Sequence, residues 1–167
     1  LVAGVAKAQD LTQEQLISNL LNGNDDQRRD AARELGRGEY RNNREIVPAL
    51  LLALENDKYI VRTYAAEALA NNRNEIAFVN LAQVAGNKTS EGQAEALRSL
   101  ERSPNKERTI PLFVENINSE DRDVRIAAAR GLAQHGQDER AFQAMRTHLN
   151  STDNSIAQDY IAEGIRR

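Results

Sequence analysis

The chain of 167 residues contains no cysteine and no tryptophan, only three prolines, and 4% aromatic residues. The absence of cysteine excludes a disulfide scaffold, a thiol enzyme and a cysteine-ligated zinc site. No apolar stretch approaches the roughly 20 residues that span a bilayer, and the mean hydropathy is -0.65. With 22 basic and 25 acidic residues, the net charge of -3 gives no overall cationic field, which disfavours nucleic acid as a partner.

Residues that could carry out chemistry are also few. The two histidines, His135 and His148, belong to different helices or helix ends, and neither is followed by Glu. The sequence contains no Gly-rich phosphate loop, no nucleophile elbow and no metal-binding spacing of His and carboxylates. We therefore predict no catalytic residue, no metal site and no cofactor. His135 precedes Gly136, and we interpret it as a helix C-terminal residue that interacts with the last carbonyls.

The first residues have the form of a secretory cleavage site. Ala6 and Ala8 flank Lys7 after a short apolar stretch, and the polar Gln9 would be the mature start. An ordinary Ala-rich lead-in fits equally well, so residues 1–9 are predicted to be either a signal-peptide remnant or a disordered lead-in. The compartment is therefore left open between export to the periplasm and the cytoplasm.

What the chain does contain is an internal repeat, which is visible as four columns of matching residues in five copies. The first column is Leu16, Leu50, Leu81, Phe113 and Met145, with successive spacings of 34, 31, 32 and 32 residues. The second column, four residues later, is Leu20, Leu54, Ala85, Ile117 and Leu149. The third column is Arg28, Arg62, Gln93, Arg125 and Gln158. The fourth column, seven residues after the third, is Leu35, Leu69, Leu100, Leu132 and Ile165.

Each half of a repeat is predicted to be a helix, because its apolar residues recur at intervals of three and four. Capping boxes are predicted at Thr12 with Gln15 and at Ser90 with Gln93, while Ser119 and Asp138 precede other helical runs. Pro48 and Pro111 are predicted to fall within about the first turn of their helices, where proline is tolerated. The second helix of each pair carries small residues such as Ala65 and Ala66, which allow close helix packing. The pattern predicts ten helices in five antiparallel pairs.

This signature resembles HEAT-like repeats, in particular the short variety of about 31–34 residues that also occurs in phycobilisome lyases and related bacterial proteins. The resemblance implies an all-α, right-handed α-α superhelix, an armadillo-like solenoid of about five helix pairs. It covers residues 10–167 as a single domain, with repeats at about 10–42, 43–73, 74–105, 106–137 and 138–167. The third and fifth copies have Gln93 and Gln158 in place of Arg, so a ladder of Asp to Arg bonds is predicted to be interrupted there.

The resemblance also implies that the second helix of each pair lines a concave surface, and that its variable positions contact partners. These variable positions lie one, two, five and nine residues after each third-column residue. Ala94 and Ala127 also occupy such positions. The predicted partner-binding residues are Arg29, Arg33, Arg37, Tyr64, Glu67, Glu95, Arg98, Arg102, Arg130, Gln134, Tyr160 and Glu163. Tyr and Arg dominate the energetics of many protein interfaces. The alternative is an ordinary solvated face, with Tyr64 and Tyr160 packed against neighbouring layers.

We therefore expect a non-enzymatic scaffold or adaptor that binds a protein or peptide through the concave helical face. An alternative, suggested by the repeat subtype alone, is a lyase for a bilin chromophore or an accessory subunit of one. A third hypothesis is nucleic-acid binding through a cluster of basic residues in the first repeat. A surface helix with many salt bridges explains the same cluster. That cluster consists of Arg28, Arg29, Arg33, Arg37, Arg41 and Arg44. The last helix, with Ile156, Tyr160, Ile161 and Ile165, has no polar capping repeat after it, so we expect it either to self-associate or to be covered by further residues.

Overall fold

The computed structural model describes residues 11–149 and 155–166, so the predicted lead-in at residues 1–9 lies outside the described residues. Within these two ranges the regular structure is helical, without strands. The chain divides into two compact units, of which unit 1 ends at Leu81 and unit 2 begins at Ala82. This boundary falls inside helix α5 (Glu75–Gly86). Each unit is described by itself.

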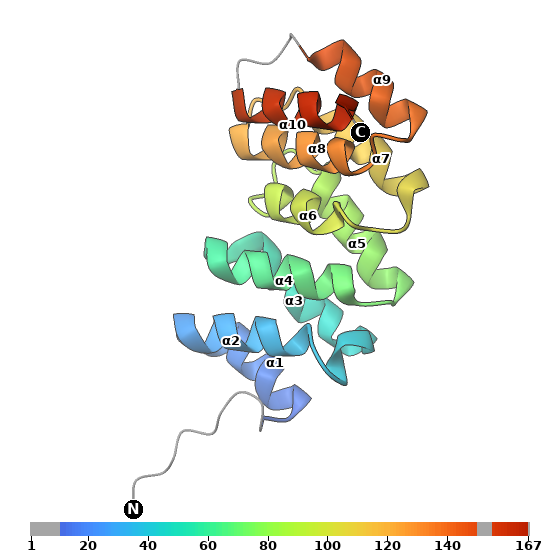
Figure 1. Ribbon diagram of the computed structural model, residues 1–167. Helices are drawn as coiled ribbons and strands as arrows, with labels where there is room; N and C mark the ends of the chain where they lie inside the picture. Colours follow the sequence, from blue (N-terminus) through green and yellow to red (C-terminus); the bar gives the residue numbers. More distant parts are fainter. Residues whose placement is uncertain (1–10, 150–154, 167) are drawn as a thin grey trace, which may run out of the picture. The chain divides into compact units, whose positions relative to one another are not determined.

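Unit 1 contains two helix pairs and the first part of α5 (Figure 1). Its other helices are α1 (Gln13–Asn22), α2 (Asp25–Leu35), the short 3-10 helices η2 (Tyr40–Asn42) and η3 (Arg44–Ile46), α3 (Val47–Asn56) and α4 (Tyr59–Asn71). Helix α1 packs against α2, and α3 packs against α4. The two second helices, α2 and α4, also pack directly on each other. The pairs of unit 1 are therefore stacked, as a solenoid requires.

Unit 2 repeats this arrangement. Its helices after α5 are α6 (Gln93–Leu100), α7 (Lys106–Asn116), α8 (Arg122–Gln134), α9 (Glu139–His148) and α10 (Ser155–Arg166). Helix α8 packs against α6 on one side and α10 on the other, so the three second helices form a row (Figure 1). Each predicted repeat range contains two α-helices of the described residues. The predicted all-α solenoid of helix pairs is confirmed.

The repeat columns form the core of both units. Every first-column residue, from Leu16 to Met145, is at most 1% exposed. In the fourth column Leu35, Leu69 and Leu132 are fully buried. The last members of the second and fourth columns, Leu149 and Ile165, are only partly buried. Since about 25 cal/mol is gained per Å² of apolar surface removed from water, these columns supply much of the driving force for folding.

The helix starts were predicted with mixed success. Thr12 and Gln15 form the predicted capping box. The box predicted at Ser90 is wrong, because Gly92 precedes α6 and the side chain of Gln93 turns inward, away from the cap. Asp138 caps α9 by accepting a hydrogen bond from the Arg140 amide, which agrees with its place before a helical run.

The two prolines occupy different positions in their helices. Pro48 is the second residue of α3, as predicted. Pro111 is the sixth residue of α7, so its predicted place in the first turn is wrong. The cause is an earlier helix start, since the amides of Arg108 and Thr109 both donate to the Asn105 carbonyl and add a turn before the proline.

Close packing in unit 2 depends on glycine as well as alanine. A Cβ at Gly131 of α8 would lie 2.5 Å from the ring of Phe113 on α7. A Cβ at Gly164 of α10 would lie 2.7 Å from the Cα of Ala133 on α8. These distances are too short for any side chain, so both glycines are required for the approach of the helices.

Candidate functional site

The predicted partner-binding residues lie on the second helices or just beyond their ends, and they divide between the two units. We call Arg29, Arg33, Arg37, Tyr64 and Glu67 the unit 1 face, and Glu95, Arg98, Arg102, Arg130, Gln134, Tyr160 and Glu163 the unit 2 face. The exposed members are Arg37, Glu67, Arg102, Gln134 and Glu163. The half-buried members are Arg29, Arg33, Tyr64, Arg98, Arg130 and Tyr160.

The expected exposure of Glu95 is wrong, because this side chain is buried, with 5% of its surface exposed. Ala94 and Ala127, from the same columns, are also buried. Helix α6 packs against α8 and α7, and six of its eight residues are buried, Glu95 among them. The prediction that the positions counted from the third column form a solvent-exposed stripe is therefore wrong for α6.

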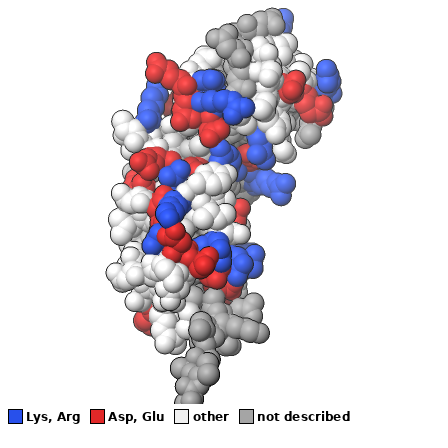
Figure 2. All heavy atoms as spheres, turned by 90° about the vertical axis from the view of Figure 1, so that its left-hand side faces the viewer, with Lys and Arg blue, Asp and Glu red and all other residues white. Residues whose placement is uncertain are grey.

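Two arginines of the unit 1 face, Arg29 and Arg33, are paired with neighbouring carboxylates. Arg29 Nη1 lies 2.7 Å from Asp26 Oδ1, and Arg29 Nη2 lies 3.0 Å from Asp30 Oδ1. Arg33 Nε lies 3.3 Å from Glu34 Oε1. Figure 2 shows basic and acidic side chains next to one another on the face it presents. This arrangement agrees with a salt-laced helix and argues against the nucleic-acid hypothesis for the basic cluster.

The unit 2 face is organised around Arg130. Its Nη2 lies 3.2 Å from Oε2 of Glu101, which follows α6 and is 5% exposed. The guanidinium carbon of Arg130 lies 5.6 Å from the centre of the Tyr160 ring on α10. The guanidinium group is therefore held between a carboxylate just beyond α6 and an aromatic ring on α10, and a cation over an aromatic face is attracted by the quadrupole of the ring. Tyr160 thus contacts the neighbouring helix, as the alternative interpretation expects.

Glu101 is the most unusual ionisable group on this face. Burial raises the pKa of its carboxyl, while the positive charges of Arg130, Arg102 and Arg98 act in the opposite direction. Its second oxygen, Oε1, is buried without a hydrogen-bond partner among the described residues. Arg130 contacts this buried carboxylate directly, whereas Arg98 Nη2 lies 3.9 Å from Oδ2 of the exposed Asp123.

The third repeat column has a structural role. Arg28, Arg62 and Arg125 each donate a hydrogen bond from Nη1 to a backbone carbonyl between the two helices of their pair, those of Gly23, Asp57 and Ser119, at 2.8, 3.1 and 2.6 Å. Gln93 Nε2 donates to the Ala85 carbonyl in the last turn of α5, at 3.1 Å. In these four copies the third-column side chain therefore links the second helix to the end of the first helix or to the loop that follows it.

The third column also links consecutive repeats. Arg28 Nε lies 2.8 Å from Asp57 Oδ2 in the next repeat, which is the predicted type of Asp to Arg bond. At Gln93 the ionic ladder is interrupted, as predicted, but Gln93 Nε2 donates to Asn116 Oδ1 at 2.9 Å. A hydrogen bond between two amide side chains therefore replaces the ion pair. The alignment of the repeats did not predict this hydrogen bond.

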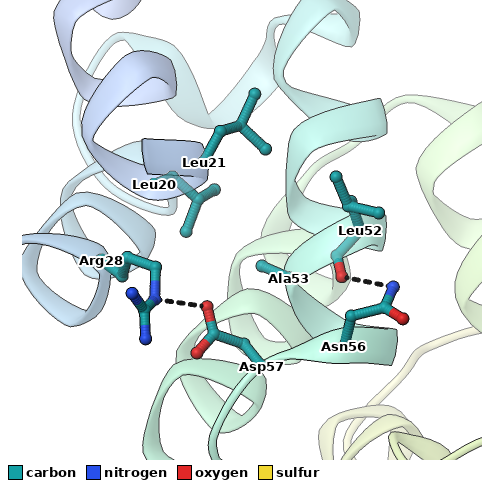
Figure 3. Close-up of a pocket in the computed structure, with 7 residues that line it drawn as sticks. All are labelled: Leu20, Leu21, Arg28, Leu52, Ala53, Asn56 and Asp57. Carbon is teal, nitrogen blue, oxygen red and sulfur yellow. Dashed lines mark hydrogen bonds and ion pairs between the residues drawn. The ribbon is translucent and has the colours of Figure 1, made fainter. Parts of the chain in front are cut away.

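A pocket of about 320 Å³ in unit 1 was missed by the sequence reasoning (Figure 3). It is lined by Leu20, Leu21, Arg28, Leu52, Ala53, Asn56 and Asp57. Leu21 and Leu52 are 43% and 53% exposed. A signal was present, because the position of Leu52 is occupied by Ser18, Gln83, Glu115 and Thr147 in the other copies. The Arg28 and Asp57 ion pair lies at the polar side of this pocket.

His135 directly follows α8, as predicted, but its side chain is buried against Phe113 rather than directed to the last carbonyls. The two rings are stacked, with centroids 6.2 Å apart and planes inclined by 27°. Within the described residues, no group of three or more His, Asp or Glu side chains could hold a metal ion. None of the helices in the described ranges is long and apolar enough to cross a membrane.

Comparison with known proteins supports the resemblance seen in the sequence. The family model for HEAT repeats matches residues 14–101 and again residues 78–166. The two matches together span all ten α-helices of the described residues except the first residue of α1. A comparison with curated proteins gives no match.

Proposed function

Because the chain belongs to the HEAT-repeat family, we propose that it is a non-enzymatic scaffold or adaptor that binds a protein or peptide partner through its second helices. HEAT repeats commonly serve as scaffolds for protein interactions, and their fold is typically non-enzymatic. The fold by itself does not select the partner, since one repeat architecture serves many unrelated functions. The proposal therefore depends on the side chains that the second helices present.

The observation that carries the proposal is the fixed position of Arg130 between Glu101 and Tyr160. A long side chain that is already ordered loses less conformational entropy when a partner binds, so more of its interaction energy contributes to affinity. Arg and Tyr are also the residue types most enriched at binding hot spots. This cluster on the unit 2 face thus has the composition and the rigidity of a recognition surface.

The unit 1 face supplies a second group of accessible side chains. Arg37 and Glu67 are exposed. Tyr64, which lies between them in the sequence, is half-buried. Arg37 directly follows the buried Gly36, beyond the last turn of α2. Arg37 is therefore suitable for a substitution that changes the surface charge without removing an ion pair of the helix.

The test is affinity capture from a native extract with two variants that carry the same change in charge. The face variant combines Arg37→Glu and Arg102→Glu, one substitution on each face. The control variant combines Arg44→Glu and Arg146→Glu, which are exposed residues of η3 and α9, outside the second helices. Circular dichroism and thermal melting must match the wild type for both variants before captured proteins are compared.

We expect a partner that the wild type and the control variant retain and that the face variant loses. Reversal of a charge at a protein interface changes association strongly, because like charges are then juxtaposed. If the control variant loses the same protein to the same extent, or if the face variant retains every captured protein, the faces formed by the second helices and the residues just beyond their ends are not the binding surface, and the proposal is wrong.

A further inference from the structure

We propose that the pocket between α1 and α3 binds a basic amphipathic helix of a partner protein, with apolar side chains in the pocket and basic side chains on either side of it. This surface is formed mainly by the first helices of the first two repeats, whereas the unit 1 face belongs to the second helices. The inference therefore goes beyond the proposed function, and either can be right without the other.

The pocket lies at one end of a surface that two parallel helices form. At the start of α1, Gln13 Nε2 lies 3.2 Å from Oε2 of Glu45, which directly precedes the start of α3. At the other end, Leu21 from α1 and Leu52 from α3 point into the space between the two helices (Figure 3). The starts of α1 and α3 are thus adjacent, and so are their ends, so the helices run side by side in the same direction.

The polar groups at the pocket already have partners within the chain. Arg28 Nε lies 2.8 Å from Asp57 Oδ2, and Arg28 Nη1 donates to the Gly23 carbonyl at 2.8 Å. The side-chain amide of Asn56 donates to the Leu52 carbonyl at 3.1 Å. What the pocket offers a ligand is therefore the apolar surface of its leucines. Its volume of about 320 Å³ is at the lower end for small-molecule pockets and suits one or two aliphatic side chains.

Exposed carboxylates lie along both helices, on the same sides as the leucines of the pocket. On α1, Glu14 lies seven residues before Leu21, and on α3, Glu55 lies three residues after Leu52. Residues at these spacings share one side of a helix, and all four are exposed. At about 1.5 Å per residue, Glu14 lies about 10 Å before the level of Leu21, and Glu55 about 5 Å beyond the level of Leu52. A carboxylate is therefore present on each side of the pocket.

The charge of this region is negative when α1, α3, η3 and the ion pairs at the pocket are all counted. Helices α1 and α3 contribute one charged residue each, and both are glutamates. The two ion pairs at the pocket are neutral, and so is η3, which carries one basic and one acidic residue. The residues counted are Glu14, Asp25, Arg28, Arg44, Glu45, Glu55, Asp57 and Lys58. An excess of two negative charges remains, so the complementary ligand is basic.

The other copies of the repeat lack this combination. The position of Leu21 is occupied by Glu55, Gly86, Asn118 and Asn150 in the other copies, and the position of Leu52 is polar in all of them. The first helices of unit 2 contain basic residues, which α1 and α3 do not: Lys106 and Arg108 in α7, and Arg140 and Arg146 in α9. The apolar pocket with flanking carboxylates is therefore a property of the first two repeats and not of the repeat architecture.

A helix fits this surface better than an extended peptide or a membrane. An extended peptide gains its main-chain hydrogen bonds from the edge of a sheet, and the described residues form no strand. A helix satisfies its own backbone and presents apolar side chains one turn apart to the pocket. Anionic lipid headgroups would meet the excess of negative charge, which disfavours a membrane as the occupant.

The experiment measures the fluorescence anisotropy of a labelled, capped helical peptide of about 18 residues, a length at which an isolated helix can form. Two leucines one turn apart stand at its centre, arginines stand one and two turns away in both directions on the same side, and alanine and glutamine fill the other positions. One reference peptide has alanine in place of the leucines, and the other has glutamate in place of the arginines. Circular dichroism must show equal helicity for the three peptides.

The full chain is titrated as wild type and as two pairs of variants. Leu52→Ala is paired with Ile156→Ala, which truncates an aliphatic side chain of α10 that is 40% exposed. Glu55→Lys is paired with Glu115→Lys, which makes the same charge reversal at an exposed residue of α7. The face variant with Arg37→Glu and Arg102→Glu shows whether the peptide occupies the second helices instead.

We expect the wild type to bind the peptide with leucines and arginines at least about tenfold more tightly than either reference peptide. Leu52→Ala should weaken binding by about tenfold, because apolar contact in the pocket is lost. Glu55→Lys should weaken it by about three- to tenfold at low ionic strength, and by less as salt is added. Ile156→Ala, Glu115→Lys and the face variant should each change the affinity by less than about twofold.

The inference is wrong if either reference peptide binds as tightly as the first, since the pocket or the charge then does not select the ligand. It is also wrong if Leu52→Ala weakens binding no more than Ile156→Ala does. If the face variant loses the peptide, the peptide occupies the second helices, and this inference fails while the proposed function stands.

Two further measurements test other occupants of the pocket. If the wild type sediments with vesicles of phosphatidylcholine and phosphatidylserine and Leu52→Ala does not, the occupant is a lipid surface and the inference is overturned. If light scattering gives a dimer for the wild type and a monomer for Leu52→Glu, the occupant is a second copy of the chain, which also overturns it. A wild type that remains monomeric and does not sediment with vesicles, but binds the basic peptide through Leu52, supports the inference.

Discussion

His135 is a buried ionisable group whose surroundings favour its neutral form. Its ring lies on Phe113, and its Nε2 is buried without a hydrogen-bond partner among the described residues. Burial lowers the pKa of this histidine, Lys106 lowers it further, and Asp138 raises it by less. Protonation would therefore place a positive charge in a site that offers Nε2 no acceptor.

The stability of the protein should fall as the pH decreases through about 6.5, the ordinary pKa of histidine. Above this pH the ring is neutral in both the folded and the unfolded chain. Below it the unfolded chain takes up a proton before the folded chain does, because the folded pKa is lowered, so unfolding is favoured. Urea unfolding of the wild type and of His135→Phe at several pH values measures this effect.

In His135→Phe the ring contact with Phe113 is kept and the titrating group is removed. Contributions from all other groups cancel in the difference between the two proteins. The wild type should therefore lose stability relative to the variant as the pH falls from about 7.5 to 5, where the proton uptake of an ordinary histidine is nearly complete. A difference that stays constant over this range would show that His135 does not titrate differently in the folded and unfolded states.

At the scale of single residues, the sequence predicted where residues lie along the helices better than which side chains they contact. It placed His135 at a helix end but not on Phe113, because stacking depends on a helix pair whose geometry the sequence does not state. It placed Arg130 and Tyr160 in the same predicted face, and their mutual contact was left open as packing between layers. Glu101 was missed, since it lies one residue past the fourth column and has no special spacing.

The helices themselves were largely readable, because their apolar periodicity reflects burial directly. The first column is buried in every copy, so the period of about 32 residues fixed the helix pairs. The exceptions have local causes. Residues from Asn105 onward extend α7 before Pro111, and Gly92 rather than Ser90 precedes α6. These positions depend on single hydrogen bonds that a repeat alignment does not resolve.

Gln93 joins three helices of unit 2 and is expected to matter more than an ordinary surface amide. Its Nε2 donates to the Ala85 carbonyl of α5 and to Asn116 Oδ1 of α7, and its side chain is buried. Gln93→Leu keeps a similar volume and removes both donors, which leaves two buried acceptors without partners. We expect a loss of about 1–3 kcal/mol in the free energy of unfolding, measured by urea denaturation.

Gln143→Leu is the matched control for this substitution. Gln143 is exposed on α9, and its Nε2 donates to Glu139 Oε1 at 2.7 Å within the same helix. Loss of this exposed bond should change stability by about 0.5 kcal/mol or less. Equal effects of the two substitutions would mean that the amide link at Gln93 contributes no more than a surface hydrogen bond.

At the scale of the whole molecule, the packing is local within each unit. In unit 1, α2 and α4 contact their own first helices and each other, and in unit 2, α8 contacts α6, α7 and α10. In arrays of this kind, stability is approximately a sum of repeat stabilities and of interactions between neighbours. A defect in the core should therefore loosen the repeats around it most.

Leu69 and Leu132 allow this expectation to be tested with equivalent residues. Both belong to the fourth column, both are fully buried, and one lies in each unit. Leu69→Ala and Leu132→Ala should each cost about 2–5 kcal/mol, because each leaves a cavity in a packed core. Hydrogen exchange followed by mass spectrometry should show the loss of amide protection mainly in unit 1 for Leu69→Ala and mainly in unit 2 for Leu132→Ala.

Leu52→Ala is the control, because it makes the same change from leucine to alanine at an exposed position. Leu52 is 53% exposed, so its truncation leaves no enclosed cavity. It should change the free energy of unfolding by about 1 kcal/mol or less. If each core substitution instead lowers protection equally in both units, the chain unfolds as one cooperative block. The nearest-neighbour description would then be wrong for this chain, and a substitution on one face could weaken a partner contact on the other through global unfolding alone.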